Sequence, residues 1–64
     1  MNSSEILKKR LSELLLCERK AKMLYTVCLE HIEDDFLRTR MQEVLNDEIV
    51  HEQLVQKLID SYKN

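Results

Sequence analysis

The chain of 64 residues contains no glycine, no proline and no tryptophan, and its aromatic residues are limited to two tyrosines and one phenylalanine. The absence of glycine excludes a glycine-rich loop that cradles phosphate groups. Without glycine and proline, no residue is present that would break a helix. Leucine, glutamate, lysine and arginine dominate, and the β-branched residues are too scattered for strands. The sequence therefore predicts one small, wholly helical domain, near the lower size limit for a self-sufficient core.

Long apolar segments are also lacking, since no run approaches the roughly 20 residues that span a bilayer. Residues 1–4 do not lead into a signal-peptide pattern. The formal net charge is −2 with both signs interspersed, which offers no basic surface for nucleic acid or an anionic membrane. Cys17 and Cys28 stand roughly 16 Å apart along a helix, too far for an intrachain disulfide. We therefore expect a cytoplasmic protein with buried, reduced thiols and with neither a membrane nor nucleic acid as a partner.

The acidic run at residues 33–35 is the one plausible interruption of the helical sequence. Residues suited to cap a helix precede both predicted helices, namely Asn2, Ser3 or Ser4 before the first and Asp34 or Asp35 before the second. The sequence predicts helices at about 3–31 and 35–62 with a turn near 32–35. Together they make up a single domain that spans residues 1–64.

Apolar residues recur in alternating steps of four and three, which is the pattern of a helix face packed against other helices. In the first half this face comprises Leu7, Leu11, Leu14, Glu18, Ala21, Tyr25, Cys28 and Ile32. In the second half it comprises Leu37, Met41, Val44, Glu48, His51, Val55, Leu58 and Tyr62. Further apolar residues flank both faces, namely Ile6, Leu15, Leu16, Met23, Leu24, Leu45, Ile49, Val50, Leu54 and Ile59. Because two helices cannot cover so wide an apolar surface, we expect an antiparallel hairpin that forms a homodimeric four-helix bundle, and larger homo-oligomers remain an open alternative.

Glu18, Glu48 and His51 are the polar exceptions on these two faces. When the faces are paired about the turn, Glu18 lies opposite His51, and Glu48 lies opposite Ala21, the smallest residue of its face. The three polar side chains then occupy two adjacent layers, with apolar layers above and below. A carboxylate in such a place costs several kcal/mol unless a cation neutralises it. Two carboxylates that converge with an imidazole therefore predict a bound metal ion.

Glu48 and His51 form a Glu-x-x-His motif, in which both side chains share one helix face. One hairpin supplies too few ligands to enclose a pair of metal ions, whereas a twofold dimer supplies four glutamates and two histidines. The four negative charges balance two divalent cations. This ligand set suits iron or manganese, and zinc can replace them. Di-iron carboxylate bundles use the same set, so we expect two iron ions per dimer.

With these residues the chain resembles the ferritin-like superfamily, and most closely the encapsulated ferritins, which are two-helix half-ferritins that complete a four-helix di-iron site by dimerising. The resemblance covers nearly the whole chain and rests on Glu18, on the Glu-Ile-Val-His segment 48–51 and on the 30-residue separation of the two glutamates. Segment 47–52 is also similar to the Asp-Glu-x-x-His motif of rubrerythrins. The resemblance implies that Glu18 and His51 are terminal ligands and that Glu48 is the bridging carboxylate. It also implies that the dimer is a ferroxidase, which oxidises Fe(II) with O₂ or peroxide for iron storage or detoxification.

Tyr25 stands where encapsulated ferritins carry an aromatic pair near the iron. The resemblance implies that its hydroxyl hydrogen-bonds a ligand carboxylate or that it takes part in electron transfer, and a core aromatic is the alternative. Leu24 replaces the other member of that pair. Cys17 and Lys20 replace acidic residues through which iron enters in that family, so that route is not expected here. The family continues into a shorter helix and an encapsulation signal, which this sequence lacks, so we expect neither its ring-shaped assembly nor targeting to an encapsulin shell.

Other assignments stay open at this point. Asp47 is suited either to orient the His51 imidazole or to lie in solvent, and His31 suits a helix end better than a metal site. A rubrerythrin-like peroxidase is the closest alternative to a ferroxidase, although the Cys-x-x-Cys pairs of a rubredoxin-like electron donor are lacking. In a different class of function, the hairpin is a metal-free interaction or regulatory module, and its polar layers fix register and oligomeric state.

Overall fold

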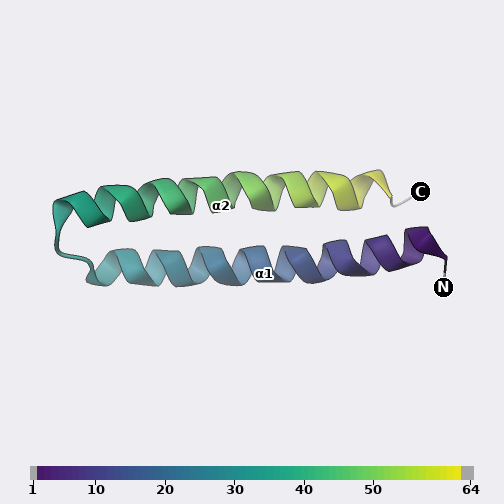
Figure 1. Cartoon of the computed structure of the whole chain (residues 1–64), viewed down its shortest axis with the longest axis horizontal. Helices are drawn as coiled ribbons and strands as arrows, with labels where there is room; N and C mark the ends of the chain where they lie inside the picture. Colours follow the sequence, from purple (N-terminus) through teal and green to yellow (C-terminus); the bar gives the residue numbers. More distant parts are fainter. Residues whose placement is uncertain (1, 63–64) are drawn as a thin grey trace.

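The computed structural model describes residues 2–62, which form two long helices packed side by side as an antiparallel hairpin (Figure 1). Helix α1 covers Ser3–His31 and helix α2 covers Asp35–Ser61. Both termini lie at the same end of a rod that measures 49 × 15 × 13 Å. The predicted all-α, two-helix hairpin is therefore confirmed, while α2 ends one residue before the predicted position 62. Across the described residues, neither helix is apolar enough over a sufficient length to cross a bilayer.

Side-chain caps fix where both helices begin. The side chain of Asn2 accepts a hydrogen bond from the backbone N–H of Glu5 at 2.9 Å. Asp34 accepts one from the backbone N–H of Leu37, also at 2.9 Å. Each cap satisfies a backbone donor that the first turn of a helix leaves without an intrahelical partner. The acidic run between the helices thus ends α1 and starts α2 within three residues, which forces the chain to reverse direction.

The end of α1 is tied to α2 by Arg38. Its guanidinium donates to the backbone carbonyl of Leu29 at 2.6 Å and to that of Ile32 at 3.1 Å. The last carbonyls of a helix have no intrahelical donor, so a charged side chain that reaches them stabilises the helix end. Arg38 therefore holds the two helices together at the turn, where few apolar side chains are buried.

The buried core of the hairpin is small and consists of Leu11, Leu15, Leu45 and Val55. The predicted faces are correct for Leu11 and Val55 but wrong for their neighbours, because Leu14 and Val44 are exposed while Leu15 and Leu45 are buried in their place. The face that meets the other helix is thus rotated by about one residue from the predicted one. Two helices touch along one flank of a wide apolar stripe, and the sequence alone does not say which flank.

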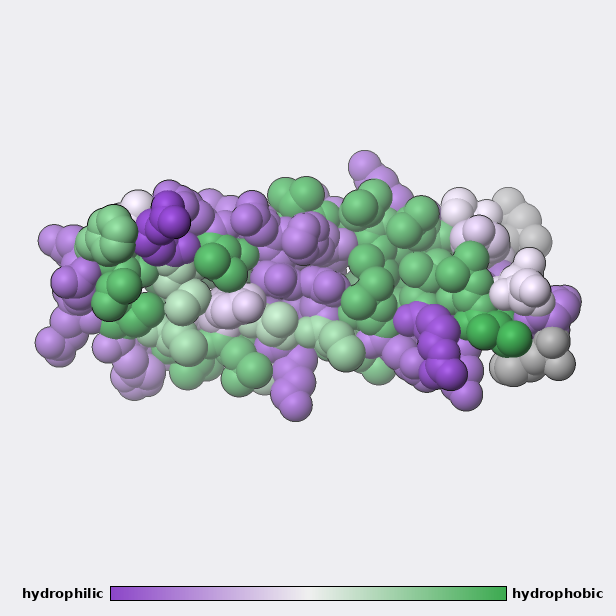
Figure 2. Space-filling model, in the orientation of Figure 1, coloured by the Kyte–Doolittle hydropathy of each residue, from purple (hydrophilic) through white to green (hydrophobic). Residues whose placement is uncertain are grey.

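Each apolar stripe therefore divides into three rows. The central row holds Leu11, Glu18, Tyr25 and Ile32 on α1, and Met41, Glu48, Val55 and Tyr62 on α2. The inner flank, which faces the other helix, holds Leu15, Lys22, Leu29, Leu45, Glu52 and Ile59. The open flank lies on the opposite side of the central row and holds Leu7, Leu14, Ala21, Cys28, Leu37, Val44, His51 and Leu58. Figure 2 shows that apolar side chains also gather on the surface, most of all over the half of the hairpin next to the termini.

A test of the turn replaces Arg38 with methionine, which keeps the length of the side chain and removes its donors. Loss of two charge-assisted hydrogen bonds at an exposed helix end is expected to reduce the free energy of unfolding by about 1 kcal/mol. The matched control is Arg40→Met, because Arg40 makes only an exposed ion pair with Glu43 at 3.4 Å. That change is expected to cost less than about 0.5 kcal/mol. Urea unfolding followed by circular dichroism measures both, and equal losses would contradict the role of Arg38.

Candidate metal centre

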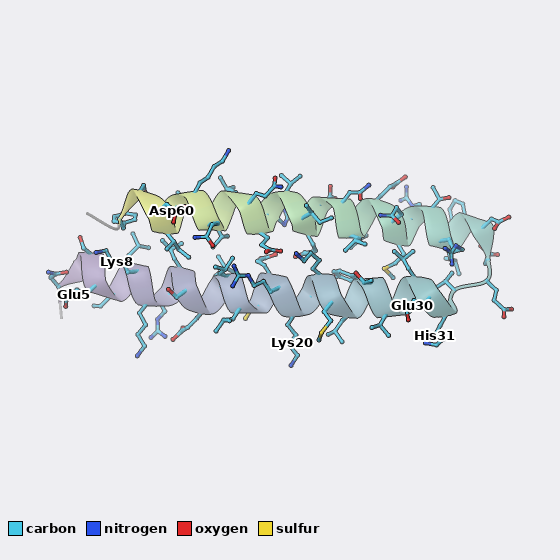
Figure 3. All side chains as sticks on the ribbon, turned by 180° about the vertical axis from the view of Figure 1, so that it is seen from behind. Glu5, Lys8, Lys20, Glu30, His31 and Asp60 are labelled. Atoms are coloured by element: carbon cyan, nitrogen blue, oxygen red, sulfur yellow. The ribbon has the colours of Figure 1, made fainter. Side chains whose placement is uncertain are left out.

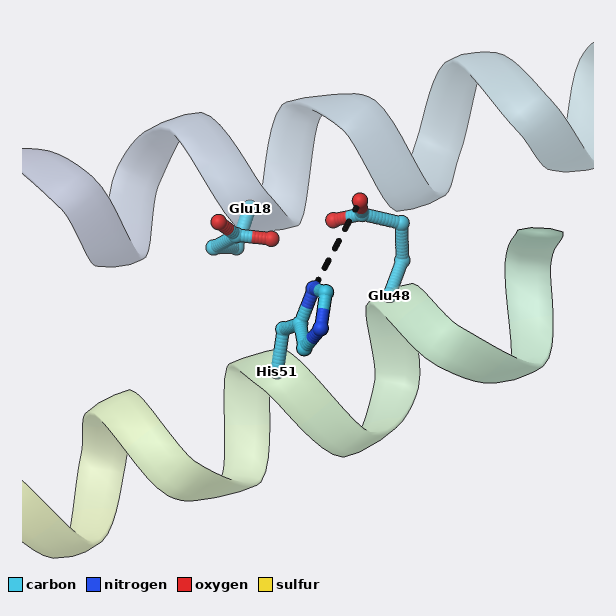
Figure 4. A group of neighbouring side chains, drawn as sticks. All are labelled: Glu18, Glu48 and His51. Atoms are coloured by element: carbon cyan, nitrogen blue, oxygen red, sulfur yellow. Dashed lines mark ion pairs between the residues drawn. The ribbon is translucent and has the colours of Figure 1, made fainter.

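The structure brings the three predicted ligands together midway along the hairpin. Glu18 comes from α1, while Glu48 and His51 come from successive turns of α2 and point toward α1 (Figure 4). One ligand atom from each residue lies within 4.8 Å of the corresponding atoms of the other two. Within α2, the Nδ1 atom of His51 is 3.9 Å from Oε1 of Glu48. The antiparallel arrangement, rather than any local turn, creates this group, since Glu18 is 30 residues from Glu48.

The three side chains differ in how far the hairpin covers them. Glu18 and Glu48 belong to the central row and are half-buried, and the Glu48 side chain is 18% exposed. His51 belongs to the open flank, and its side chain is 57% exposed. The prediction that all three lie on a buried face is therefore wrong for His51 in the single hairpin. The imidazole sits at the edge of the group, on the side that α1 and α2 leave uncovered.

The two carboxylates at the centre of the group have no protein cation between them. The Oε2 atoms of Glu18 and Glu48 are shielded from solvent, and neither has a hydrogen-bond donor among the residues that the structure describes. The pKa of Glu48 is raised, first by a hydrogen-bonding contact with Glu18 that needs a shared proton, and then by burial and by repulsion from Glu18 and Asp47. His51 opposes this rise. Two ionised carboxylates in this arrangement favour any cation that can come between them.

Glu52, one turn further along α2, gives the contrasting case. Its side chain is also 18% exposed, but its Oε2 atom is 2.6 Å from the ammonium of Lys22, and its Oε1 atom is 3.4 Å from Nε of Arg19. The close contact with the Lys22 ammonium is the main cause that lowers the pKa of Glu52, and the charges of Lys22 and Arg19 add to it against the effect of burial. Of the three half-buried carboxylates in the described chain, Glu52 alone has a lysine or an arginine within ion-pair distance, whereas Glu48 has the His51 imidazole at 3.9 Å.

The residues of the group fit a divalent metal ion. Two carboxylates and an imidazole form a mixed oxygen and nitrogen donor set, which suits iron, manganese or zinc. The shielded, unpaired oxygens of Glu18 and Glu48 are the atoms that an ion would satisfy. One divalent ion would also balance the two negative charges of one hairpin. Three ligands from one chain leave part of the coordination sphere open, as a site that must admit a reactant requires.

The remaining sequence-derived candidates lie outside this group. Tyr25 is half-buried on α1, and its hydroxyl makes no hydrogen bond within the described part of the chain, so its role stays a prediction. His31 is exposed at the end of α1 and points away from α2 (Figure 3). Asp47 is exposed and acts on the group only by raising the pKa of Glu48. Buried thiols were expected, yet Cys17 and Cys28 are both exposed, because they lie on or beside the uncovered side of α1.

The cluster of Lys22, Arg19 and Glu52 is the feature that sequence reasoning missed. A signal for it was present, since Lys22 and Glu52 are four residues beyond Glu18 and Glu48 and thus on the same helix faces. Comparisons with models of protein families, with curated proteins and with solved structures find no match for this chain. The assignment of the site therefore rests on the geometry of its own side chains.

Glu48→Gln and Glu52→Gln form a matched pair, because the two glutamates are equally exposed on one helix and differ in their neighbours. At neutral pH without metal, Glu48→Gln is expected to raise the melting temperature, since it removes a repelled charge. Glu52→Gln is expected to lower it, since it breaks the contacts with Lys22 and Arg19. Thermal unfolding by circular dichroism in EDTA and low salt measures both.

The dependence on pH has opposite signs at the two glutamates. The raised pKa of Glu48 means that its contribution to stability is full below about pH 4.5 and is lost as pH rises through the folded value. The lowered pKa of Glu52 means that its contribution is full above about pH 4.5 and is lost as pH falls through the folded value. The benefit of Glu48→Gln should therefore vanish by pH 4. A benefit that persists there, or one that Glu52→Gln shares at neutral pH, would contradict the account of the two sites.

Proposed function

We propose that the chain is a ferritin-like di-iron carboxylate protein whose homodimer oxidises Fe(II) with O₂ or peroxide, in iron storage or detoxification. The observation that carries the proposal is the group of Glu18, Glu48 and His51, in which each carboxylate has a shielded oxygen without a hydrogen-bond donor and no lysine or arginine of the described chain pairs with either. Manganese and zinc are expected to compete for the same ligands. The chain thus supplies half of a site, with one ion for each hairpin.

The open flank supports a second copy of the chain as the other half. It carries exposed leucine and valine side chains on both sides of His51, which is itself more than half exposed. A second hairpin packed on this flank would cover those apolar side chains and enclose the imidazole in the same step. Two triads together supply four carboxylates and two imidazoles, whose charge two divalent ions balance.

The reaction needs no group beyond iron and the oxidant. Two Fe(II) ions each give up one electron, and O₂ takes both electrons with two protons to leave as hydrogen peroxide. With peroxide as the oxidant, the two electrons and two protons break its O–O bond, and two water molecules leave. Glu18 and Glu48 bind the substrate ions, and their negative charge favours the more highly charged Fe(III) product. Apolar residues of the open flank, such as Leu14 and Val44, would limit the access of water to the site. His51 completes the ligand set as a neutral donor.

An anaerobic titration with Fe(II) tests this function directly. Binding is expected to saturate at two ions per dimer and to increase the dimer fraction seen by size-exclusion chromatography, and admission of air should produce the absorbance of Fe(III). The chain has two histidines, both exposed, so His31→Ala is the control for His51→Ala. We expect at least a tenfold loss of affinity in His51→Ala and none in His31→Ala. A stoichiometry other than two ions per dimer, or unchanged Fe(II) binding by Glu48→Ala, would contradict the assignment of the di-iron site.

The interface can be tested apart from the metal ligands. Leu14 and Leu16 are both exposed on α1, at 43% and 65%, but Leu14 lies on the open flank and Leu16 on the outer side of the helix. Leu14→Lys is expected to give a chain that stays monomeric with and without Fe(II), because a buried charge would oppose packing of the second copy. Leu16→Lys should dimerise as the unmodified chain does. Sedimentation equilibrium with and without Fe(II) measures this, and an identical response of the two variants would refute the assigned interface.

A metal-free interaction module is the second candidate function. It is favoured by apolar side chains that the proposed dimer would not cover, among them Leu16, Met23 and Val27 on the outer side of α1. In that case the polar group would serve to fix the register of helix packing. Equal stability of the dimer with and without divalent metal would favour this module over the ferroxidase.

A further inference from the structure

Lys22 occupies an unusual place for a lysine. It is half-buried on the inner flank of α1, in the row that otherwise holds Leu15 and Leu29. Its side chain is 38% exposed, and its ammonium lies 2.6 Å from the shielded Oε2 atom of Glu52. Arg19 approaches the other oxygen of Glu52 from a more exposed position, with a side chain that is 52% exposed. Lys22 is therefore the cation that neutralises the buried side of Glu52.

Glu52 has the qualities of a metal ligand apart from this contact. It follows Glu48 by four residues, so the two side chains leave successive turns of α2 on neighbouring parts of its surface. It is covered by the hairpin to the same extent as Glu48. Without Lys22, Glu52 would keep only the contact of its Oε1 atom with the more exposed Arg19, and its shielded Oε2 atom would have no cation beside it.

We propose that Lys22 sets the number of metal ions that the site accepts. Its ammonium takes the position beside Glu52 that a second cation would otherwise occupy, and so restricts each hairpin to the one ion held by Glu18, Glu48 and His51. This inference rests on the proposed function, since it assumes that the triad binds a metal. Lys22 thus limits the number of ions that each hairpin binds, although it contacts neither the metal nor the oxidant.

Titration with Co(II), which stays divalent in air at neutral pH, counts the ions by calorimetry and by visible absorbance. The unmodified chain is expected to bind one ion per protomer. Lys22→Met, which keeps an unbranched side chain and removes the charge, is expected to bind two. The double variant Lys22→Met/Glu52→Gln should return to one ion, because the added site depends on the Glu52 carboxylate. Arg19→Met should also bind one ion, since Lys22 still holds Glu52.

The possible failures of the two proposals are distinct. If the unmodified chain binds one ion and Lys22→Met also binds one, Lys22 does not set the stoichiometry, while the triad remains a metal site. If the unmodified chain binds no ion, the proposed function is wrong and this inference falls with it. Lys22→Gln is titrated in parallel after circular dichroism has shown that each variant is helical. Should Lys22→Met not fold, a single bound ion in folded Lys22→Gln would overturn the inference, and two would support it.

Discussion

Two carboxylates, Glu18 and Glu48, meet between the helices with no lysine or arginine of the described chain beside them, and much of the behaviour of the hairpin follows from this contact. Repulsion between them opposes the packing that brings α1 and α2 together. The chain offsets this cost with Leu11, Leu15, Leu45 and Val55, with the two side-chain caps and with the link from Arg38 to the end of α1. So small a core leaves the metal-free hairpin with little stability to spare. A bound cation would turn the least favourable contact of the structure into a favourable one.

The width of the apolar stripes connects the site to assembly. A hairpin buries the inner flank of each stripe and leaves the open flank in solvent, and the open flank is where His51 lies. The proposed third ligand, His51, is thus on the surface that a second copy would cover. Metal binding and dimerisation are therefore expected to favour each other. A bound ion would remove the repulsion between the carboxylates, and a second copy would cover the open flank around His51.

Much of this organisation could be predicted from the sequence. The absence of glycine and proline, the acidic run before Leu37 and the four-three spacing predict the hairpin, and pairing the faces about the turn predicts that Glu18, Glu48 and His51 converge. The sequence could not show that Leu15 rather than Leu14 is buried, because the stripe is wide enough to pack on either flank. The pairing of Lys22 with Glu52 was missed because a lysine on a helix is ordinarily assigned to solvent.

That pairing also bears on why Glu18 and Glu48 lack a partner. If the polar layers served only to fix the register of the helices, a lysine paired with Glu48 would fix it at a lower cost in free energy. The chain can place a lysine between the helices, since Lys22 pairs with Glu52 in the next turn. The chain instead pairs Glu52 with Lys22 and sets an imidazole beside the unneutralised carboxylates. Protonated histidine would be a poor substitute for lysine at neutral pH, whereas neutral histidine is a good metal ligand. The hairpin therefore holds one half-buried carboxylate, Glu52, that is paired with a lysine, and two, Glu18 and Glu48, that remain available to an external cation.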